Sequence, residues 1–339
     1  MPRLRAIPLL CTCCILYMSI CVHGAAPKTQ QWLHGRDLSK SSEPWIETLS
    51  WKPRAFLYHN LLSDAEANHL VDVAKPFMRR STVVGNKGED VVDNIRTSYG
   101  TFLPRYQTET IGKIEERIAT WTKLNVSNQE DIQILRYGQG QKYGAHYDQL
   151  VEDTPRVATV LIYLKDGVVG GETAFPESSE WIDPSIGKRM GPFSKCAQGV
   201  VAVKPKKGDA LLFWSAKPDG SHDEASLHTG CPVISGIKWT ATFWIHSAPF
   251  RPEQLEEPVQ VDEKLKPEEC KDTEPECPRW AAAGECQKNK PFMIGDDFSV
   301  GACRVSCKMC EDCATDDRAC KSRNRVIAGY LSLDELDEA

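Results

Sequence analysis

The chain has 339 residues, 41% of them hydrophobic, and a formal net charge of −6. This length accommodates one domain of about 200 residues with an adequate apolar core, together with a smaller second unit. Acidic residues concentrate in 251–269 and 311–339 and no basic face is evident, so no nucleic-acid partner is expected.

The N-terminus has the order of a secretory targeting segment. Arg3 and Arg5 precede an apolar run over 6–22, which small residues follow at 24–26. Residues 1–26 are therefore expected to be a cleaved signal peptide, because the apolar run is slightly shorter than the ~20 residues that span a bilayer. An uncleaved signal anchor is the alternative. Both alternatives place the rest of the chain in the lumen of the endoplasmic reticulum or Golgi, in the second case as a type II membrane protein.

Cysteine usage agrees with this compartment. Of 14 cysteines, four lie in the targeting segment, two in the large domain and eight between Cys270 and Cys320. Such density predicts a disulfide framework formed in an oxidising lumen. Zinc is the alternative, but no histidine follows His246, which disfavours it.

Composition divides the rest of the chain into segments. Residues 27–50 are polar and are expected to form a stem. The large domain is expected at 51–250, because its hydrophobic pattern is regular. A Pro- and Glu-rich acidic linker at 251–269 precedes a small cysteine-rich domain at 270–310, and a solvated acidic tail is expected at 311–339.

Hydrophobic periodicity predicts helices first and strands afterwards. Ser63 and Glu66 have the spacing of a capping box, which predicts a helix over 64–79, and a second helix is expected over 108–122. Strands are expected at 131–137, 157–164, 200–204, 209–214 and 238–246. This order indicates a mainly β, α+β fold: a β-sandwich or jelly roll supported by N-terminal helices.

Three residues are candidates for a metal site. On a strand, His146 and Asp148 face the same side, so their imidazole and carboxylate can converge. His228, just before the last long strand, would complete a 2-His-1-carboxylate triad, the set that binds non-haem Fe(II) and leaves positions open for cosubstrate and O₂. Alone, His-x-Asp is a weak signal, because surface pairs of this kind are common.

A lysine strengthens the metal hypothesis. Lys238 follows His228 by ten residues within an otherwise apolar strand. A 2-oxo dicarboxylic acid that chelates iron leaves a second carboxylate, which a buried cation would bind. The alternative is a lysine at an edge or on the outer face of the sheet.

Several ordered motifs surround these residues. They are ILRYGQGQKYGAHYD at 134–148, GGETAFP at 170–176, KPKKGDALLFW at 204–214 and SLHTGCPVISGIKW at 226–239. Over residues 51–250 the chain closely resembles prolyl 4-hydroxylases, particularly those of plants and green algae. The resemblance implies a double-stranded β-helix (jelly roll), Fe(II), 2-oxoglutarate, O₂ and L-ascorbate, and 4-hydroxylation of peptidyl proline with release of succinate and CO₂. It also implies a proline-rich substrate of the secreted or cell-wall hydroxyproline-rich glycoprotein type.

The same resemblance assigns further residues. Tyr137 and Thr173 would join Lys238 around 2-oxoglutarate. Side chains expected along the peptide groove are Tyr143, Arg156, Trp244, His246 and Arg96, the last on a loop that closes over substrate.

Disulfide pairs are also implied by resemblance. Matching family positions pair Cys196 with Cys231, and the six-cysteine module at 270–310 is similar to ShK-toxin-like (ShKT) domains, although six cysteines alone permit 15 pairings. The expected pairs in the module are Cys270–Cys310, Cys277–Cys303 and Cys286–Cys307, with Cys313–Cys320 as an extra pair.

Asn125 begins the sequon Asn125-Val126-Ser127 and is a candidate glycosylation site. Two other functions stay open for the large domain. One is a 2-oxoglutarate oxygenase acting on lysyl residues or on a small molecule, and the other is a non-catalytic jelly-roll binding protein.

Overall fold

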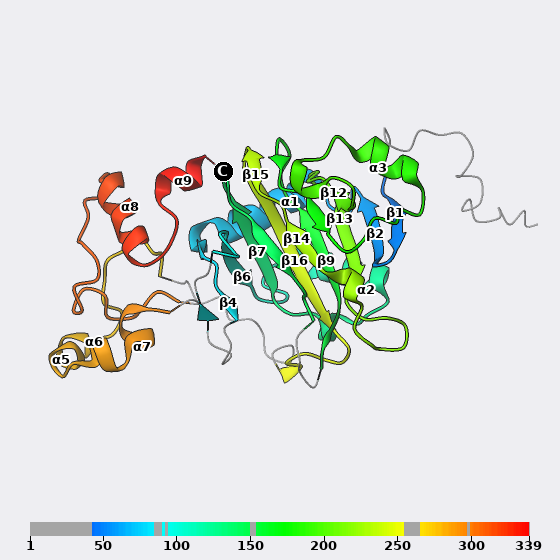
Figure 1. Cartoon of the computed structure of the whole chain (residues 1–339). Coiled ribbons are helices and arrows are strands. Elements are labelled where there is room, and N and C mark those ends of the chain that lie inside the picture. The colour runs from blue at the N-terminus through cyan, green and yellow to red at the C-terminus, as the bar shows by residue number, and fades with distance from the viewer. Residues whose placement is uncertain are drawn as a thin grey trace, which may run out of the picture. The chain divides into compact units, whose positions relative to one another are not determined.

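Antiparallel sheets form the centre of the computed structural model (Figure 1). It describes residues 43–84, 90–91, 94–149, 154–253, 265–296 and 299–338. The expected targeting segment lies outside these ranges. Within them, no helix has the length and apolar character needed to cross a membrane.

The described elements have the following bounds. The strands are β1 Trp45–Trp51, β2 Arg54–His59, β3 Arg79–Arg80, β4 Val83–Val84, β5 Asp90–Val91, β6 Tyr99–Leu103, β7 Ile132–Tyr137, β8 Tyr143–His146, β9 Arg156–Tyr163, β10 Val169–Gly170, β11 Thr173–Phe175, β12 Val201–Val203, β13 Ala210–Trp214, β14 His228–Gly230, β15 Val233–Ser235 and β16 Lys238–His246. The α-helices are α1 Asp64–Ala74, α2 Glu109–Thr122, α3 Pro184–Met190, α5 Cys277–Ala282, α6 Glu285–Lys288, α7 Lys290–Ile294, α8 Arg318–Ile327 and α9 Leu333–Asp337. Short 3-10 helices are η3 Lys75–Phe77, η4 Val126–Asn128, η5 Lys195–Ala197 and η6 Glu224–Ser226.

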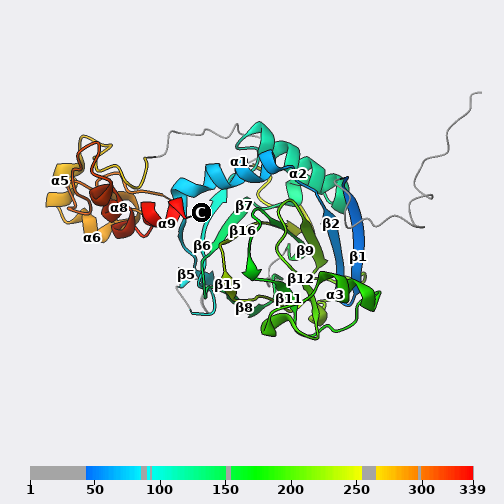
Figure 2. The same cartoon turned by 90° about the horizontal axis from the view of Figure 1, so that it is seen from above.

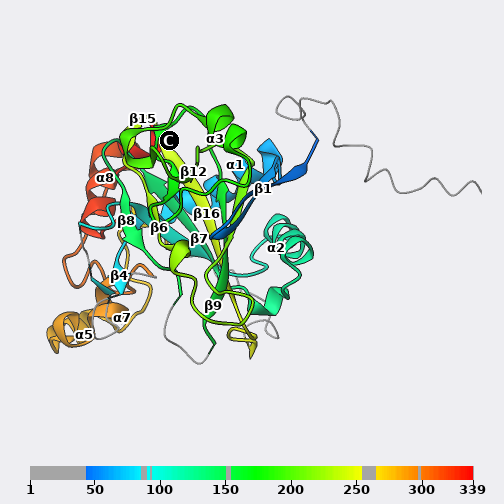
Figure 3. The ribbon, with the colours of Figure 1, turned by 45° about the vertical axis from the view of Figure 1, so that its right-hand side comes forward.

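The larger sheet has the strand order β1-β2-β13-β9-β16-β7-β6-β3 among the described residues. A smaller sheet, β12-β11-β14-β8, faces it, and α1 and α2 cover the opposite side of the larger sheet (Figure 2 and Figure 3). Two facing antiparallel sheets with helices on one outer side are the expected jelly-roll core with its supporting helices.

Alternation along the strands separates the helix-packed core from the inside of the jelly roll. One set of alternate residues on β7, β9 and β16, including Ile134, Val160 and Phe243, packs with α1 and α2 in the main core. The other set faces the small sheet and lines a pocket. Because both faces are covered, every residue of β16 is buried.

Both predicted helices are present. Ser63 and Glu66 form the expected capping box at α1, where the Arg117 pair and the cap lower the pKa of Glu66 to about 2 despite its partial burial. The α-helix ends at Ala74 and one 3-10 turn continues it to Phe77, because Pro76 lacks the N–H that an α-helix requires.

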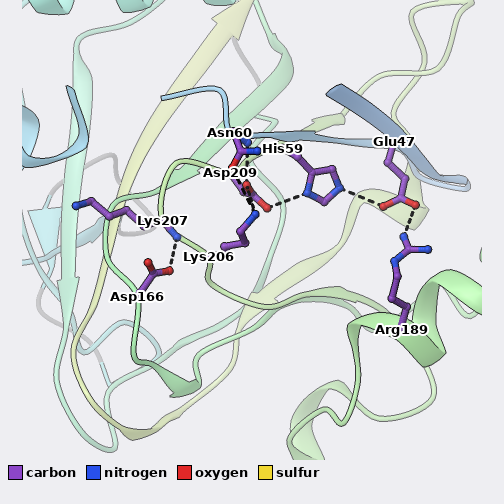
Figure 4. A network of polar contacts seen from close by, with 8 residues as sticks. All are labelled: Glu47, His59, Asn60, Asp166, Arg189, Lys206, Lys207 and Asp209. Atoms are coloured by element: carbon purple, nitrogen blue, oxygen red, sulfur yellow. Dashed lines mark hydrogen bonds and ion pairs between the residues drawn. The ribbon is translucent and has the colours of Figure 1, made fainter. Parts of the chain in front are cut away.

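The large domain begins earlier than expected. Edge strand β1, Trp45–Trp51, pairs with β2, and its residues 45–50 had been placed in the stem on composition. His59 on β2 hydrogen-bonds Asp209 through Nδ1 and Glu47 through Nε2, at 3.0 and 3.2 Å, and Arg189 of α3 pairs with Glu47 (Figure 4). Although burial opposes its charge, these two carboxylates raise the pKa of His59. The network therefore links β1 to β2, to the residue just before β13, and to α3.

The cysteine-rich region is held by disulfides around a very small apolar cluster. The structure joins Cys270–Cys310, Cys277–Cys303 and Cys286–Cys307, and in the large domain Cys196–Cys231; these are the pairs that the sequence resemblance implied. It also joins Cys313–Cys320, the extra pair expected outside the family pattern. In the module the described buried apolar residues are Cys277, Met293 and Cys303.

The C-terminal segment, residues 318–338, differs from the solvated tail that was expected at 311–339. It contains α8 and α9, and Leu331 and Leu336 are buried in the main core of the large domain. Its acidic residues lie mostly on the exposed side of these helices, so the charge of the segment conceals its two buried leucines.

Candidate metal centre

Two short neighbouring strands bring the candidate ligands together. β8 ends at His146, β14 begins at His228, and their antiparallel register places these two residues opposite each other. Asp148 lies two residues beyond His146 and returns to the same side. One ligand atom from each side chain lies within 4.8 Å of the other two.

The spacing of these atoms suits a shared cation. His146 Nε2 is 3.6 Å from one carboxylate oxygen of Asp148, and His228 Nε2 is 3.6 Å from the other. These distances are too long for hydrogen bonds, so the nitrogens and oxygens converge without satisfying one another directly. Two imidazoles and one carboxylate form the donor set of a facial Fe(II) site.

Hydrogen bonds set the tautomer of both histidines. His146 Nδ1 donates to the Gly144 carbonyl at 2.8 Å, and His228 Nδ1 donates to the Ser226 carbonyl at 3.0 Å. With the proton on Nδ1, each Nε2 presents a lone pair to the centre of the cluster. Metal-ligating histidines use this arrangement commonly.

Burial and a threonine control the charge of the cluster. Burial, reinforced by nearby His228, lowers the pKa of His146 to about 3, so its imidazole is neutral. Although burial opposes ionisation of Asp148, the two histidines and the Thr159 hydroxyl hold the pKa of this carboxyl below its ordinary value. Thr159 on β9 donates to Asp148 Oδ2 at 2.6 Å, which leaves Oδ1 free for a ligand.

Lys238 lies in the same pocket and not on an outer face. It is only 3% exposed at the start of β16, opposite Tyr137 on β7. Its ammonium is 5.3 Å from the Tyr137 ring centre and 5.7 Å from that of Tyr163. Burial lowers the pKa of Lys238 to about 7, with Glu172 opposing the shift. An anionic ligand would offset the cost of this buried charge.

Thr173 and Tyr137 complete this end of the pocket. Thr173 on β11 is 1% exposed, and its hydroxyl accepts a hydrogen bond of 2.9 Å from the buried Tyr163 hydroxyl. The Thr173 hydrogen is then available to a ligand. Burial raises the pKa of Tyr137 to about 12, so its hydroxyl remains a donor at neutral pH.

Arg96 and Tyr143 cover the metal-ligand side. The Tyr143 ring stacks on His146 with centroids 3.6 Å apart, and the Arg96 guanidinium lies 4.6 Å above the Tyr143 ring. Arg96 also donates to Gln133 Oε1 at 2.6 Å and to the Thr82 carbonyl at 3.2 Å. Arg96 and Tyr143 thus share a wall of the pocket with His146.

Trp244 lines the pocket, whereas Arg156 and His246 lie beside it. The Arg156 guanidinium is 3.9 Å from the Trp244 ring centre and hydrogen-bonds Glu130 Oε2 at 3.0 Å. His246, fully buried, bonds the other oxygen of Glu130 at 2.7 Å. Although burial opposes it, His246 and Arg156 lower the pKa of Glu130.

Sequence reasoning missed Glu130, Gln133, Thr159 and Thr240. The inward register of the strands was the available signal: alternate residues of β7, β9 and β16 line the pocket. These lining residues are Gln133, Leu135, Tyr137, Thr159, Leu161, Lys238, Thr240, Thr242 and Trp244. Glu130 precedes β7, and nothing in its local sequence singles it out.

Buried polar atoms in the pocket wall indicate that it accommodates a polar ligand. Arg96 Nε, Thr240 Oγ1 and Trp244 Nε1 have no hydrogen-bond partner among the described residues. Such atoms are costly in a folded protein unless a ligand or water pairs with them. The three metal-ligand candidates and Lys238 line the same pocket.

The predicted glycosylation site Asn125 and the Cys196–Cys231 disulfide do not line this pocket. Asn125 is exposed, and its side chain accepts a hydrogen bond from the Ser127 N–H at 3.0 Å. The Cys196–Cys231 disulfide anchors the chain three residues after His228, where the Cys231 N–H also donates to the Glu172 carbonyl at 2.8 Å.

Comparisons with known proteins agree with this site. Residues 132–246 match the family model of the 2OG-Fe(II) oxygenase superfamily. The chain is 43% identical over 273 residues to prolyl 4-hydroxylase 2 of Arabidopsis thaliana, an alignment that covers 78% of this chain and 88% of the relative. It is 45% identical over 222 residues to prolyl 4-hydroxylase 5 of the same plant, with 63% and 76% covered.

Among solved structures, the chain is similar to the viral collagen prolyl hydroxylase of Paramecium Bursaria Chlorella virus-1 in its 2OG complex. The sequence identity is 29%, the TM-score is 0.42, and the match covers 57% of this chain and 96% of the viral one.

Proposed function

Because the chain belongs to the prolyl 4-hydroxylases, a family of Fe(II)- and 2-oxoglutarate-dependent oxygenases, we propose that its iron is bound by His146, Asp148 and His228. The enzyme hydroxylates prolyl residues in peptides. It consumes 2-oxoglutarate and O₂ and releases succinate and CO₂, with ascorbate as the reductant expected for the family.

The ligand geometry supports the metal assignment. The Nδ1 protons of both histidines are committed to backbone carbonyls, and Thr159 occupies one oxygen of Asp148, so each ligand offers one defined atom. Bound Fe(II), together with 2-oxoglutarate and O₂, supplies an oxidant capable of hydroxylating an unactivated C–H bond. The task of the surrounding chain is to orient both substrates and exclude water.

Lys238 is the proposed anchor of 2-oxoglutarate. Its buried side chain lines the same pocket, where it can pair with the carboxylate that does not chelate the metal. Tyr137 and Thr173 would donate hydrogen bonds to the same carboxylate. The Tyr163 hydroxyl orients Thr173 for this role.

The proposed peptide-binding residues lie in or beside the pocket that holds the candidate metal ligands. Arg96, Tyr143 and Trp244 line the pocket itself. Arg156 and His246 form a fixed pair through Glu130, and the Arg156 guanidinium covers Trp244. These aromatic and cationic groups suit an extended proline-rich chain, which offers ring faces and backbone carbonyls.

The observation that carries the proposal is the presence of Lys238 in the same pocket as the three converging ligands. The full-length protein, supplied with Fe(II), 2-oxoglutarate and ascorbate, should release one succinate for each 4-hydroxyproline formed in a proline-rich peptide. Mass spectrometry of the peptide, together with a succinate assay, measures this ratio.

The matched variant is His146→Ala, assayed with its folding verified by circular dichroism. We expect succinate and hydroxyproline both to disappear. Peptide-dependent succinate release by that variant would contradict the metal assignment.

Lysyl and small-molecule oxygenation are tested in the same assay. A lysine-containing peptide without proline, and free proline, should fail to stimulate succinate release. Stimulation by either, without stimulation by the proline-rich peptide, would replace the prolyl assignment. A non-catalytic binding protein would bind the peptide and release no succinate in any mixture.

We also propose that the enzyme acts in the lumen of the secretory pathway, on hydroxyproline-rich secreted or cell-wall glycoproteins. The disulfides support an oxidising compartment. The exposed Asn125 sequon supports glycosylation there, and the N-terminal pattern supports a signal peptide or signal anchor. The three disulfides of residues 270–310 support an ShKT-like module. Loss of lumenal targeting on deletion of residues 1–26 would test the location.

A further inference from the structure

The C-terminal segment, residues 318–338, packs against the large domain. Helix α8 carries Arg325, whose guanidinium is 1% exposed. Arg325 donates to the Pro76 carbonyl at 2.8 Å and to the Leu331 carbonyl at 2.7 Å, and it pairs with Glu268 at 2.7 Å. One buried cation therefore links the segment to the end of η3.

The segment also covers the free edge of the larger sheet. Strand β3 is the last strand of that sheet in its described part, and it pairs with β6 on one side. On the other side, Tyr330 forms an antiparallel bridge with Arg79, and the Leu331 N–H donates to the Met78 carbonyl at 2.9 Å. The C-terminal segment thus supplies backbone pairing that an edge strand otherwise lacks.

Side chains reinforce this pairing. The Arg79 guanidinium lies 4.5 Å from the Tyr330 ring centre and donates to the Ala328 carbonyl at 2.9 Å. Leu331 and Leu336 enter the main core, and Arg136 of β7 donates to the Glu335 carbonyl at 3.0 Å. The position of β3 is therefore determined from both sides.

A short path connects β3 to the pocket. Directly after β3, the Ser81 N–H donates to the Ser98 carbonyl at 2.9 Å. Thr82, the next residue, accepts a hydrogen bond of 3.2 Å from Arg96. Arg96 in turn covers Tyr143, which stacks on His146. Only two residues, Arg80 and Ser81, lie between Arg79 and Thr82, whose carbonyl holds Arg96.

We propose that Arg79 and Tyr330 are positioning residues for Arg96, so that the C-terminal segment sets the affinity of the enzyme for its peptide. This inference rests on the proposed function, in which Arg96 lines the peptide groove. It gives the segment after the disulfide module a role in substrate binding through β3. Along this path only Tyr143 contacts a candidate metal ligand, His146, whose Nδ1 is held separately by the Gly144 carbonyl.

The test compares Tyr330→Ala with Arg318→Ala in the full-length protein. Arg318 lies in the same segment, but its exposed side chain pairs with Asp334 and Asp337 and not with β3. Loss of the Arg79–Tyr330 stack should raise the peptide KM about three- to tenfold, with kcat and the KM for 2-oxoglutarate unchanged. Arg318→Ala should leave all three values unchanged.

Hydrogen exchange supplies a readout that does not depend on turnover. The amides of Ser81 and Gly144, which bond the Ser98 and Ile95 carbonyls, should exchange faster in Tyr330→Ala than in the parent. A lowered melting temperature with unchanged exchange at both amides and an unchanged peptide KM would overturn the proposal. It would show that Tyr330 acts in packing only.

A second variant covers the case in which Tyr330→Ala does not fold. Arg79→Lys keeps the charge and the strand but removes the planar stack, and the same peptide KM and exchange changes are expected. Their absence in Arg79→Lys would equally overturn the proposal. If the parent protein hydroxylates no peptide, the proposed function fails, whereas the exchange measurement still decides whether the C-terminal segment restrains the Arg96 loop.

Discussion

Two cations near the candidate metal centre, the partly buried Arg156 and the buried Lys238, are treated by the fold in opposite ways. Arg156 is neutralised by Glu130, which also binds His246, so this side of the site is complete before any ligand arrives. Lys238 lies over aromatic rings at 3% exposure, and burial lowers its pKa to about 7. The first cation is part of a rigid frame, whereas the second requires an anionic ligand.

This difference separates the two substrates. The cosubstrate is a small dianion whose charge can offset the burial of one lysine. A proline-rich peptide carries no obligatory charge. On its proposed side Arg156 is balanced by Glu130, and Arg96 is held by two neutral acceptors, Gln133 and the Thr82 carbonyl. The buried carboxylate of Asp148 depends on one neutral donor, Thr159, and on the two histidines.

The largest effect is expected at Lys238. Lys238→Ala removes the proposed partner of the distal carboxylate, and the KM for 2-oxoglutarate should rise about 100-fold or more, because loss of a buried charge pair is costly. The peptide KM should change little. Steady-state succinate release measures both values, with Lys217→Ala, an exposed lysine, as the control. An equal rise in the peptide KM would break the proposed division between the two sides.

A smaller effect is expected at Thr159. Thr159→Val removes the hydroxyl that orients Asp148 while keeping the shape of the side chain. Metal affinity should fall about 10- to 100-fold, as for other groups that orient metal ligands. Competition with a metallochromic chelator, using Mn(II) as a probe, measures this affinity. Thr159→Ser should retain it; similar losses in both variants would point to packing and not to the hydrogen bond.

A substitution at Glu130 tests the role of its ion pair with Arg156. Glu130→Gln removes the charge that neutralises Arg156, and the peptide KM should rise about three- to tenfold because the amide still accepts one hydrogen bond. The KM for 2-oxoglutarate should stay constant. Glu116→Gln, an exposed change on α2, is the matched control. A larger effect on 2-oxoglutarate than on peptide would reverse the comparison.

The smallest expected effect is the uptake of a fraction of a proton when 2-oxoglutarate binds beside Lys238. Since the pKa of Lys238 is lowered to about 7, its side chain in the ligand-free enzyme is largely neutral at pH 8 and protonated at pH 6. A bound carboxylate favours the charged form, so binding should take up protons at pH 8 and few at pH 6, and affinity should fall as pH rises. Calorimetry of the Mn(II) protein in buffers of different ionisation enthalpy measures the uptake, which Lys238→Ala should lose.

The sequence was sufficient for much of this site because the relevant signals are local. His146 and Asp148 show the alternation of a strand, and the motifs around Lys238 placed it with His228. The helices from Ser63 and Thr108 also followed from capping and periodicity.

Other features required contacts between distant segments. Glu130 and Arg156 form an ion pair across two strands, which no local pattern reveals. Strand β1 has few buried positions, so it resembled a polar stem. In the C-terminal segment, acidic composition predicted solvation, yet Leu331 and Leu336 are buried in the apolar cluster that also contains Met78 and residues of α1.

The most direct test of the central claim compares 2-oxoglutarate with pyruvate, a 2-oxo acid that lacks the distal carboxylate. Binding of each to the anaerobic Fe(II) protein is measured for the parent and for Lys238→Ala. The parent should prefer 2-oxoglutarate by about 100-fold or more, and the variant should bind the two acids almost equally. A variant that keeps the full preference would contradict the assignment of Lys238, and with it the account of an unbalanced cation that the cosubstrate completes.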